Sequence, residues 1–204
     1  MYEFIKKNVE SSDKIFLDAP NRNPLSFNEL HQKLEKVRNN FDNLSINRSD
    51  PVAIVLPNGP DLGFLFIACS CFAISAPLNP NYSKNEFKFY LSDLKAKFLI
   101  VDPDLKTEAS KAAFELGITI INLSFEQNIG SLKFTKNNGD SLIKTTNDYE
   151  NDTSLLLHTS GTTSKPKLVQ LSSNNLIKSS LNIGKTLYLN EEDSCLNIMP
   201  LFHI

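Results

Sequence analysis

A stretch of nine residues, rich in hydroxyl groups and lysine, is the part of the sequence best suited to chemistry. Five of its side chains carry a hydroxyl group, two are lysine, one residue is glycine and one is proline. Small hydroxyl groups donate hydrogen bonds to phosphate oxygens, glycine lets the backbone approach a ligand, and lysine binds phosphate as a point charge. This composition favours a polyphosphate site over the alternative, a polar surface hairpin. The nine residues are Thr159, Ser160, Gly161, Thr162, Thr163, Ser164, Lys165, Pro166 and Lys167.

The apolar residues around this stretch indicate which elements must hold it. Leu155–His158 precedes it and Leu168–Leu171 follows it, and both short runs predict strands. A Walker A loop has a second glycine directly before its lysine and opens a helix. Here Ser164 precedes Lys165 and a strand follows. We therefore exclude a Walker A loop and predict a loop that joins two strands.

Three helix starts are marked by capping residues. Ser26 and Glu29 have the spacing of a capping box, in which a hydroxyl oxygen and a carboxylate each bind the backbone at the other position. Ser83 and Glu86 repeat this pattern, and apolar residues at helical spacing follow both pairs. Ser172 fits the cap of a third helix.

Strand and helix patterns alternate between residues 50 and 122. Short apolar runs predict buried strands, longer segments predict helices, and Gly117 fits the end of the last helix. This order predicts an α/β layered fold with at least partly parallel strands. Residues 124–152 lose the pattern, and we interpret them as a variable surface connection that holds one short hairpin. The predicted strands are 51–56, 97–101 and 118–122, and the predicted helices are 62–74 and 105–116.

Charge and composition argue against several classes of function. The 21 basic and 23 acidic residues give a net charge of −2, whereas nucleic-acid binders usually show a basic excess. No apolar run reaches the roughly 18 residues of a membrane span, and the first residues lack the apolar core of a signal peptide. We therefore predict no nucleic-acid partner, no membrane span and a cytoplasmic location.

The cysteines and histidines predict neither a disulfide framework nor a zinc site. Cys69 and Cys71 lie in an apolar segment and the cysteine count of three is odd, so we expect buried, unreactive thiols in a reducing compartment. The three histidines are too widely separated for zinc-ligand spacing. We interpret His158, directly before the polar stretch, as a structural residue.

Beyond these patterns, the sequence resembles a known family. The segment His158–Lys167 closely resembles the phosphate-binding signature of the adenylate-forming, or AMP-binding, superfamily, which includes acyl-CoA synthetases. Residues 55–58 and 76–80 resemble the N-terminal part of that family, and Met199–His203 resembles its next motif downstream. The resemblance extends over nearly the whole chain.

One branch of the family is more similar than the others. Residues 77–93 resemble the oxalate–CoA ligase group of plants and fungi, and Ser164, in place of the commoner glycine, is also typical of that group. One position departs from the family. Leu168 stands where a glycine is usual, and leucine would be strained there if the position required a positive φ.

The resemblance implies a fold, a reaction and its cofactors. We expect an incomplete N-terminal domain of the adenylate-forming fold, an α/β structure with layered mixed sheets and flanking helices. In the implied reaction a carboxylate attacks the α-phosphate of Mg·ATP, giving an acyl-adenylate and pyrophosphate, and coenzyme A then displaces AMP. ATP, Mg²⁺ and coenzyme A are therefore the implied cofactors and co-substrates, and a small carboxylic acid is the implied substrate.

The same resemblance implies roles for individual residues. The residues from Thr159 to Lys167 match the nucleotide-binding loop, and Thr163 is implied to lie near the magnesium. His203 matches an aromatic-histidine motif, which implies a catalytic part in shaping the acyl pocket and the approach of the thiol. The alternative for His203 is an ordinary surface histidine.

Finally, the resemblance divides the chain and implies that it is incomplete. We expect a first α/β subdomain at 1–123, a variable connection at 124–152 and a truncated phosphate-loop segment at 153–204. Missing C-terminal segments of the same enzyme are then expected partners, and the chain alone is predicted to lack ligase activity. The alternatives are a truncated product that binds nucleotide weakly, and a flavodoxin-like regulatory domain, which leaves the loop unexplained. A C-terminal signal in a longer chain would instead imply a peroxisomal location.

Overall fold

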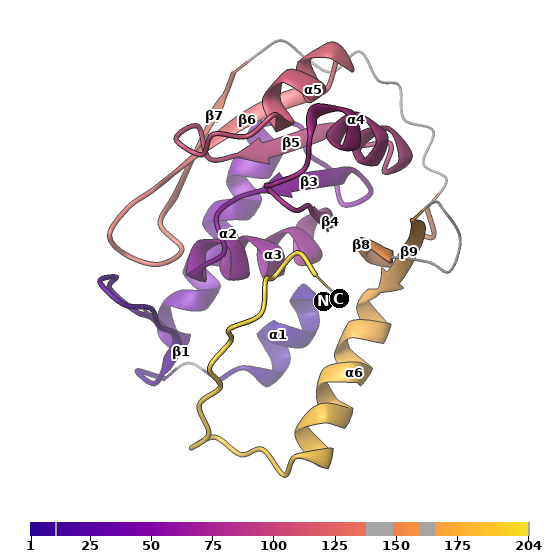
Figure 1. Cartoon of the computed structure of the whole chain (residues 1–204). Coiled ribbons are helices and arrows are strands. Elements are labelled where there is room, and N and C mark those ends of the chain that lie inside the picture. The colour runs from indigo at the N-terminus through magenta and orange to yellow at the C-terminus, as the bar shows by residue number, and fades with distance from the viewer. Residues whose placement is uncertain (11, 138–148, 160–165, 204) are drawn as a thin grey trace.

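A seven-stranded mixed sheet organises the described part of the chain (Figure 1). The computed structural model describes residues 1–10, 12–137, 149–159 and 166–203. Within them the sheet has the order β7-β6-β5-β3-β4-β8-β9, and β1 and β2 form a separate antiparallel pair. Strands β3 to β6 run parallel, β8 runs parallel to β4, and β7 and β9 are antiparallel to their neighbours. The strands are β1 (Ile15–Leu17), β2 (Leu25–Ser26), β3 (Pro51–Val55), β4 (Ile74–Pro77), β5 (Phe98–Val101), β6 (Thr119–Phe125), β7 (Leu132–Lys136), β8 (Thr153–Thr159) and β9 (Lys167–Ser172).

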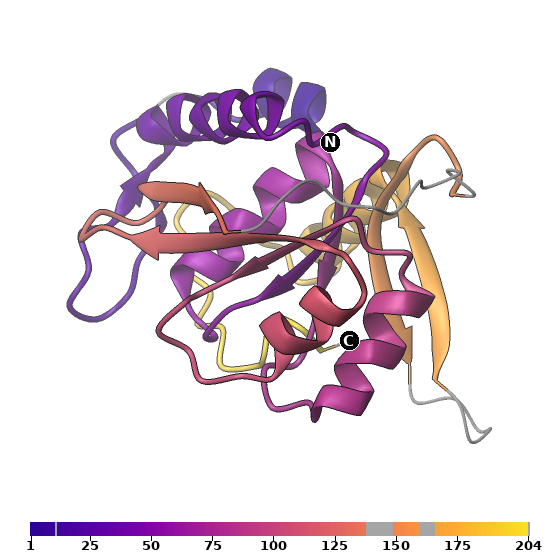
Figure 2. The ribbon, with the colours of Figure 1, turned by 90° about the horizontal axis from the view of Figure 1, so that it is seen from above.

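Helices cover both faces of this sheet (Figure 2). Helices α2 and α3 pack on one face and α4 and α5 on the other. Val52 and Ile54 face the first pair, whereas Ala53 and Val55 face the second, because successive side chains of a strand point to opposite faces. The predicted layered α/β class is confirmed. The helices are α1 (Tyr2–Asn8), α2 (Phe27–Asn43), α3 (Pro60–Phe72), α4 (Lys84–Asp93), α5 (Ala109–Glu115) and α6 (Ser173–Thr186).

The predicted helix starts are confirmed at all three capping positions. The Ser26 hydroxyl accepts a hydrogen bond from the Glu29 backbone, and the Glu29 carboxylate accepts one from the Ser26 backbone. Ser83 and Glu86 make the same reciprocal pair at the start of α4. At α6 the reciprocal partner of Ser172 is an asparagine, Asn175.

Helix α5 ends as predicted but begins later than predicted. Gly117 has a φ of +68°, its N–H donates to the carbonyl of Phe114, and the N–H of Ile118 donates to the carbonyl of Ala113. These two bonds form a Schellman motif, which requires a left-handed residue at the glycine. The predicted start at Leu105 is wrong, because its N–H bonds back to the carbonyl of Asp102 in a turn and α5 begins at Ala109.

One strand of the sheet was missed from sequence. The apolar run 62–74 predicted a helix to its end, but α3 ends at Phe72 and the extended Ala73 leads directly into β4. Ser75 pairs with Val52 of β3 on one side and with Leu155 of β8 on the other, so β4 lies between β3 and β8 in the sheet. The prediction failed because a helix and a fully buried strand are both continuously apolar here, with a single residue between them.

The connection after residue 123 contains the predicted short hairpin. Strand β6 runs on to Phe125, and β7 pairs back along it from Leu132 to Lys136. Residues 138–148 lie outside the described residues, and Thr153 begins β8 on the far side of the sheet.

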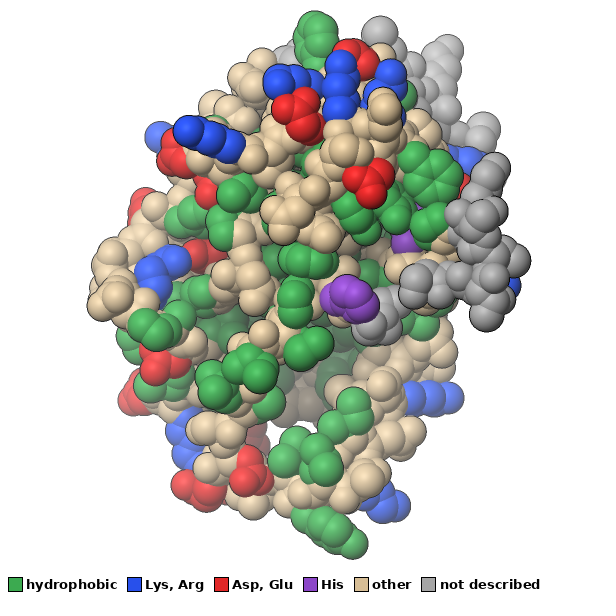
Figure 3. All heavy atoms as spheres, in the orientation of Figure 1, with side chains coloured by type: hydrophobic (Ala, Val, Ile, Leu, Met, Phe, Trp, Pro, Cys, Tyr) green, Lys and Arg blue, Asp and Glu red, His purple; other side chains and the backbone are tan. Residues whose placement is uncertain are grey.

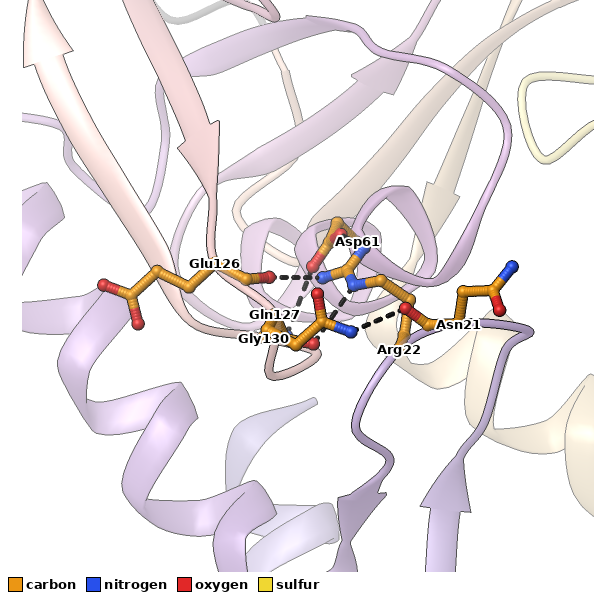
Figure 4. A network of polar contacts seen from close by, with 6 residues as sticks. All are labelled: Asn21, Arg22, Asp61, Glu126, Gln127 and Gly130. Atoms are coloured by element: carbon orange, nitrogen blue, oxygen red, sulfur yellow. Dashed lines mark hydrogen bonds and ion pairs between the residues drawn. The ribbon is translucent and has the colours of Figure 1, made fainter.

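A polar clamp centred on the buried Asp61 holds this hairpin to α3 (Figure 4). Arg22 Nη1 donates to Asp61 Oδ2 at 2.5 Å, while its other nitrogens donate to the carbonyls of Glu126 and Gln127. The second carboxylate oxygen of Asp61 accepts from the N–H of Gly130 at 3.2 Å. Every group in the clamp therefore has a partner, and it ties the segment before β2 to α3 and the β6–β7 turn.

Candidate functional site

The parallel strands β3, β4, β5, β6 and β8 all end at one edge of the sheet. Ligands of open α/β sheets bind outside the carboxyl ends of the strands. Thr159 ends β8 at this edge, and Asn58 lies just beyond the end of β3. Thr159, the first residue of the predicted phosphate set, is therefore where a ligand is expected.

The polar stretch joins the two strands of the β8–β9 hairpin, as predicted. Thr159 lies opposite Lys167 in the antiparallel ladder, which places their side chains on the same face of the hairpin. Lys167 is exposed, whereas Thr159 and Pro166 are partly buried. The positions assigned to Ser160, Gly161, Thr162, Thr163, Ser164 and Lys165, including the magnesium role of Thr163, lie outside the described residues and stay predictions.

Leu168 occupies an ordinary strand position. As a residue of β9 it pairs with His158 of β8, and its φ is not positive. Its side chain packs against the cluster on the α4 side of the sheet. The usual glycine is therefore not required for backbone conformation here, and the leucine adds apolar contact.

The base of this hairpin is fixed by a half-buried arginine that sequence reasoning missed. Arg48 Nη1 donates to the carbonyls of Ala73 and Thr153, each at 2.7 Å, and Nη2 donates to the hydroxyl of Ser154 at 2.7 Å. Burial lowers the pKa of Arg48, because desolvation disfavours its charged form. The contacts join the end of α3 to the start of β8, and no local pattern in the sequence indicated them.

Residues near His203 reach the same edge of the sheet. The N–H of Leu201 donates to Asn58 Oδ1 at 3.0 Å, and the Leu201 side chain packs against the cluster on the α2–α3 side. His203 itself is exposed, and its N–H donates to the carbonyl of Pro200. Strand β4 lies between β3 and β8, so the strands that end near Asn58 and at Thr159 are separated by one other strand. The structure thus brings the two predicted motifs to one edge without direct contact among described residues.

His158 faces helix α4 instead of the ligand edge. Its Nε2 lies 2.8 Å from Asp93 Oδ2, and its ring meets Tyr90 edge-on at 4.7 Å between centroids. Only 5% of the His158 side chain is exposed. This environment supports its interpretation as a structural residue, and the partner Asp93 was not foreseen.

The thiols of Cys69 and Cys71 are unsuited to nucleophilic chemistry, in agreement with their predicted role as buried, unreactive groups. Cys69 and Cys71 are buried, and burial raises the pKa of both, that of Cys71 to about 12. A thiol with such a pKa is not ionised near neutral pH. Within the described ranges, no group of three or more His, Cys, Asp or Glu residues could hold a metal ion.

The family assignment comes from the sequence as a whole. A family model for AMP-binding enzymes matches residues 5–204. The chain belongs to the AMP-binding enzyme family. The resemblance predicted for this chain is therefore confirmed at the level of the family.

Curated relatives of this AMP-binding chain are CoA ligases. It is 38% identical to a probable CoA ligase of Humulus lupulus over 188 residues, which cover 87% of this chain and 36% of the relative. It is 33% identical to an oxalate–CoA ligase of Arabidopsis thaliana, covering 94% and 38%, and 35% identical to that of Saccharomyces cerevisiae, covering 78% and 34%. The chain thus spans little more than a third of the length of these relatives.

Solved structures support the same fold. The o-succinylbenzoate CoA synthetase of Bacillus subtilis, in complex with its acyl-adenylate intermediate, matches with a TM-score of 0.74 and 23% identity, covering 98% of this chain and 49% of that one. MatB of Rhodopseudomonas palustris matches with a TM-score of 0.74 and 20% identity, covering 94% and 38%. The AMP-binding chain therefore has the fold of part of an adenylate-forming enzyme. No helix in its described residues is long and apolar enough to cross a membrane.

Proposed function

We propose that this chain is the N-terminal portion of an ATP-dependent carboxylate–CoA ligase. The observation that carries the proposal is the phosphate signature, which joins β8 and β9 at the carboxyl ends of the parallel strands and has Thr159 and Lys167 paired at its base. The family match and the CoA ligases among the relatives support it.

In the proposed first step, a substrate carboxylate oxygen attacks the α-phosphorus of ATP. The bond between that phosphorus and the bridging oxygen breaks, and pyrophosphate leaves with the electron pair. Such a displacement needs positioning and neutralisation of charge more than covalent help from the protein. The hydroxyls and lysines of residues 159–167 would bind the leaving pyrophosphate, with Lys167 supplying a positive charge at the sheet edge.

The oxygen-rich residue set also fits a hard divalent cation. Mg²⁺ prefers oxygen ligands and usually keeps waters and substrate phosphates in its coordination shell. We assign Thr163 as the residue nearest to it, and Mg²⁺ bound with ATP would neutralise charge on the phosphates.

In the proposed second step, the thiol of coenzyme A attacks the acyl carbon and AMP leaves. His203 is the candidate residue at the acyl site, because Leu201, two residues before it, donates a hydrogen bond to Asn58 at the same edge of the sheet. Oxalate is our first candidate acid because two of the relatives are oxalate–CoA ligases. Another small or aromatic carboxylate is the alternative.

Further polypeptide of the same enzyme would cover the exposed apolar face of the last third of the chain. Helix α6 and the segment after it expose large apolar side chains by half or more, and the space-filling view shows a hollow between them (Figure 3). Exposed apolar area of this extent is typical of an interaction surface. The exposed side chains are Leu181, Ile183, Leu187, Tyr188, Leu189, Leu196, Ile198 and Met199.

Carboxylate-dependent exchange between ATP and labelled pyrophosphate tests the proposal. We expect no exchange from residues 1–204 alone, and exchange when the chain is joined to the remaining two thirds of the Arabidopsis oxalate–CoA ligase. In the joined chain, Lys167→Ala or Thr163→Ala should reduce the exchange rate sharply, whereas Lys111→Ala on the exposed side of α5 should leave it unchanged. Robust exchange from residues 1–204 would contradict the expected inactivity. A joined chain that folds but gives no exchange with any carboxylate would overturn the proposed function and favour a nucleotide-binding fragment.

A further inference from the structure

The β8–β9 hairpin leaves the sheet soon after its base. Strand β8 makes one parallel pair with β4, between Ser75 and Leu155. Its remaining residues, from Leu156 to Thr159, pair with β9 alone. In a view along the sheet the hairpin runs beside α4 (Figure 2). The outer half of the hairpin therefore depends on side-chain contacts with that helix.

Those contacts form a row along one face of the hairpin. Leu156 and Leu168 pack in the same cluster as Phe87 and Leu91 of α4. His158 lies on the same face as Leu156, because alternate residues of a strand share a face, and it bonds Asp93 at the end of α4. Thr159 and Lys167 lie on the opposite face, away from α4.

The carboxylate of Asp93 stands where a negative charge is unfavourable. It is the last residue of α4, where the helix dipole is negative, and the last turn of α4 holds no basic residue. Because an ionised carboxylate only accepts hydrogen bonds, His158 Nε2 is the donor in the 2.8 Å contact. The imidazole thus satisfies a carboxylate that its own helix disfavours.

We propose that His158 and Asp93 are positioning residues that hold the outer hairpin, and with it Thr159 and Lys167, at the ligand edge. This proposal rests on the proposed function, in which Thr159 and Lys167 face the phosphates of ATP. The pair acts as a latch on the side of the hairpin away from the ligand. It contacts no substrate, and its effect reaches the site through the strand backbone.

Hydrogen exchange of the 204-residue chain tests the latch without requiring activity. His158→Phe keeps an aromatic ring against Tyr90 and removes the bond to Asp93. Asp93 is partly exposed, so water replaces part of the lost bond, and exchange should speed up about three- to tenfold in residues 156–159 and 167–170. Asp93→Asn should act in the same direction but more weakly. Exchange in β3 and β5 should stay unchanged.

Glu115→Gln is the matched control, because Glu115 of α5 pairs with Lys84 and Lys88 of α4, the helix that holds Asp93, and these ion pairs do not involve the hairpin. It should leave hairpin exchange unchanged. Unchanged hairpin exchange in His158→Phe would overturn the proposal, and so would an increase shared by β3 and β5, since that would mean a general structural role.

Binding of Mg·ATP to the same chains, measured by calorimetry, tests the link to the site. We expect affinity to fall about three- to tenfold in His158→Phe and to stay unchanged in Glu115→Gln. Unaltered affinity together with faster hairpin exchange would overturn the positioning role. If the unmodified chain fails to bind Mg·ATP, the proposal that this portion of the ligase binds nucleotide is wrong. The hydrogen-exchange result still decides whether the latch exists.

Discussion

Helices α2 and α6 begin alike but bury their apolar faces differently. Each starts with a reciprocal cap, at Ser26 and at Ser172, and each has an apolar stripe. The stripe of α2 is buried against the sheet, whereas α6 leaves Leu181 and Ile183 more than half exposed. Local sequence is therefore sufficient to start both helices. Only a partner surface can bury the stripe, and within the described residues α2 has one that α6 lacks.

The largest expected difference between the buried core around α2 and α3 and the exposed part of the chain from α6 onward is the cost in stability of removing an apolar side chain. Phe64 of α3 is fully buried, so Phe64→Ala should lower the free energy of unfolding by about 3–5 kcal/mol. Leu196 is 86% exposed, so Leu196→Ala should change it by less than about 0.5 kcal/mol. Urea unfolding of the 204-residue chain measures both. Comparable losses would show that the C-terminal segment is packed in solution, which would break the comparison.

Ion pairs should differ between the regions in the same way. Arg22 is paired with Asp61, whose side chain is 7% exposed, and Arg22→Met would leave that carboxylate without its cation. Breaking a buried pair costs about 3–5 kcal/mol, and we expect about 3 kcal/mol here because Arg22 is partly exposed. The pairs between Lys14 and the exposed Glu191 and Glu192 reach into the C-terminal segment, and Lys14→Met should cause no measurable change in urea unfolding. A large effect of Lys14→Met would show that these pairs anchor that segment.

Sequence predicted the elements whose signals are local. Capping boxes at Ser26 and Ser83, the Schellman glycine Gly117 and the strands around the polar stretch all depend on a few neighbouring residues. Strand β4 was missed because a buried strand and a buried helix are equally apolar. The contacts of Arg48, Arg22 and His158 were missed because each joins segments far apart in the chain.

In the candidate site, too, the features with local sequence signals were predicted and those that depend on distant segments were not. The proposed phosphate-binding residues were selected from their types and order, and Thr159, Pro166 and Lys167 are the members whose surroundings the structure describes. Thr159 and Asn58 lie at the same edge of the sheet because β3 and β8 run in the same direction. The alternation of strand and helix patterns in the sequence indicated this topology only in part. Leu168 was expected to be strained only if its position required a positive φ, and its strand conformation and packing on the α4 side show that the condition is not met.

Removing the side chain of Leu168, which lies between the buried core and the exposed C-terminal part, should have a smaller effect on stability. Leu168→Gly would remove a partly buried side chain and place glycine within a strand, so we expect a loss of about 2 kcal/mol. Leu189→Gly removes the same side chain from the exposed segment and should cost much less. Urea unfolding compares the two variants, and an unchanged stability in Leu168→Gly would mean that α4 does not hold the hairpin through this contact.

The smallest expected effect is a difference in pH dependence between the N-terminal caps of α2 and α6. The Ser26 backbone and hydroxyl groups donate to Glu29 and lower the pKa of its carboxyl group. A lowered pKa means that the cap contributes stability above the ordinary pKa of glutamate, and that this contribution is lost as the pH falls through the lowered value. The equivalent acceptor at α6 is the amide of Asn175, which does not titrate.

Nuclear magnetic resonance can follow both caps in one acid titration. The amide proton of Ser26 should shift as Glu29 protonates, whereas that of Ser172 should show no titration of its own cap. Glu29→Gln should abolish the Ser26 transition and leave Ser172 as it was. A Ser26 amide that stays constant would mean that its bond to the Glu29 carboxylate is not formed in solution, and that α2, like α6, begins without a carboxylate cap.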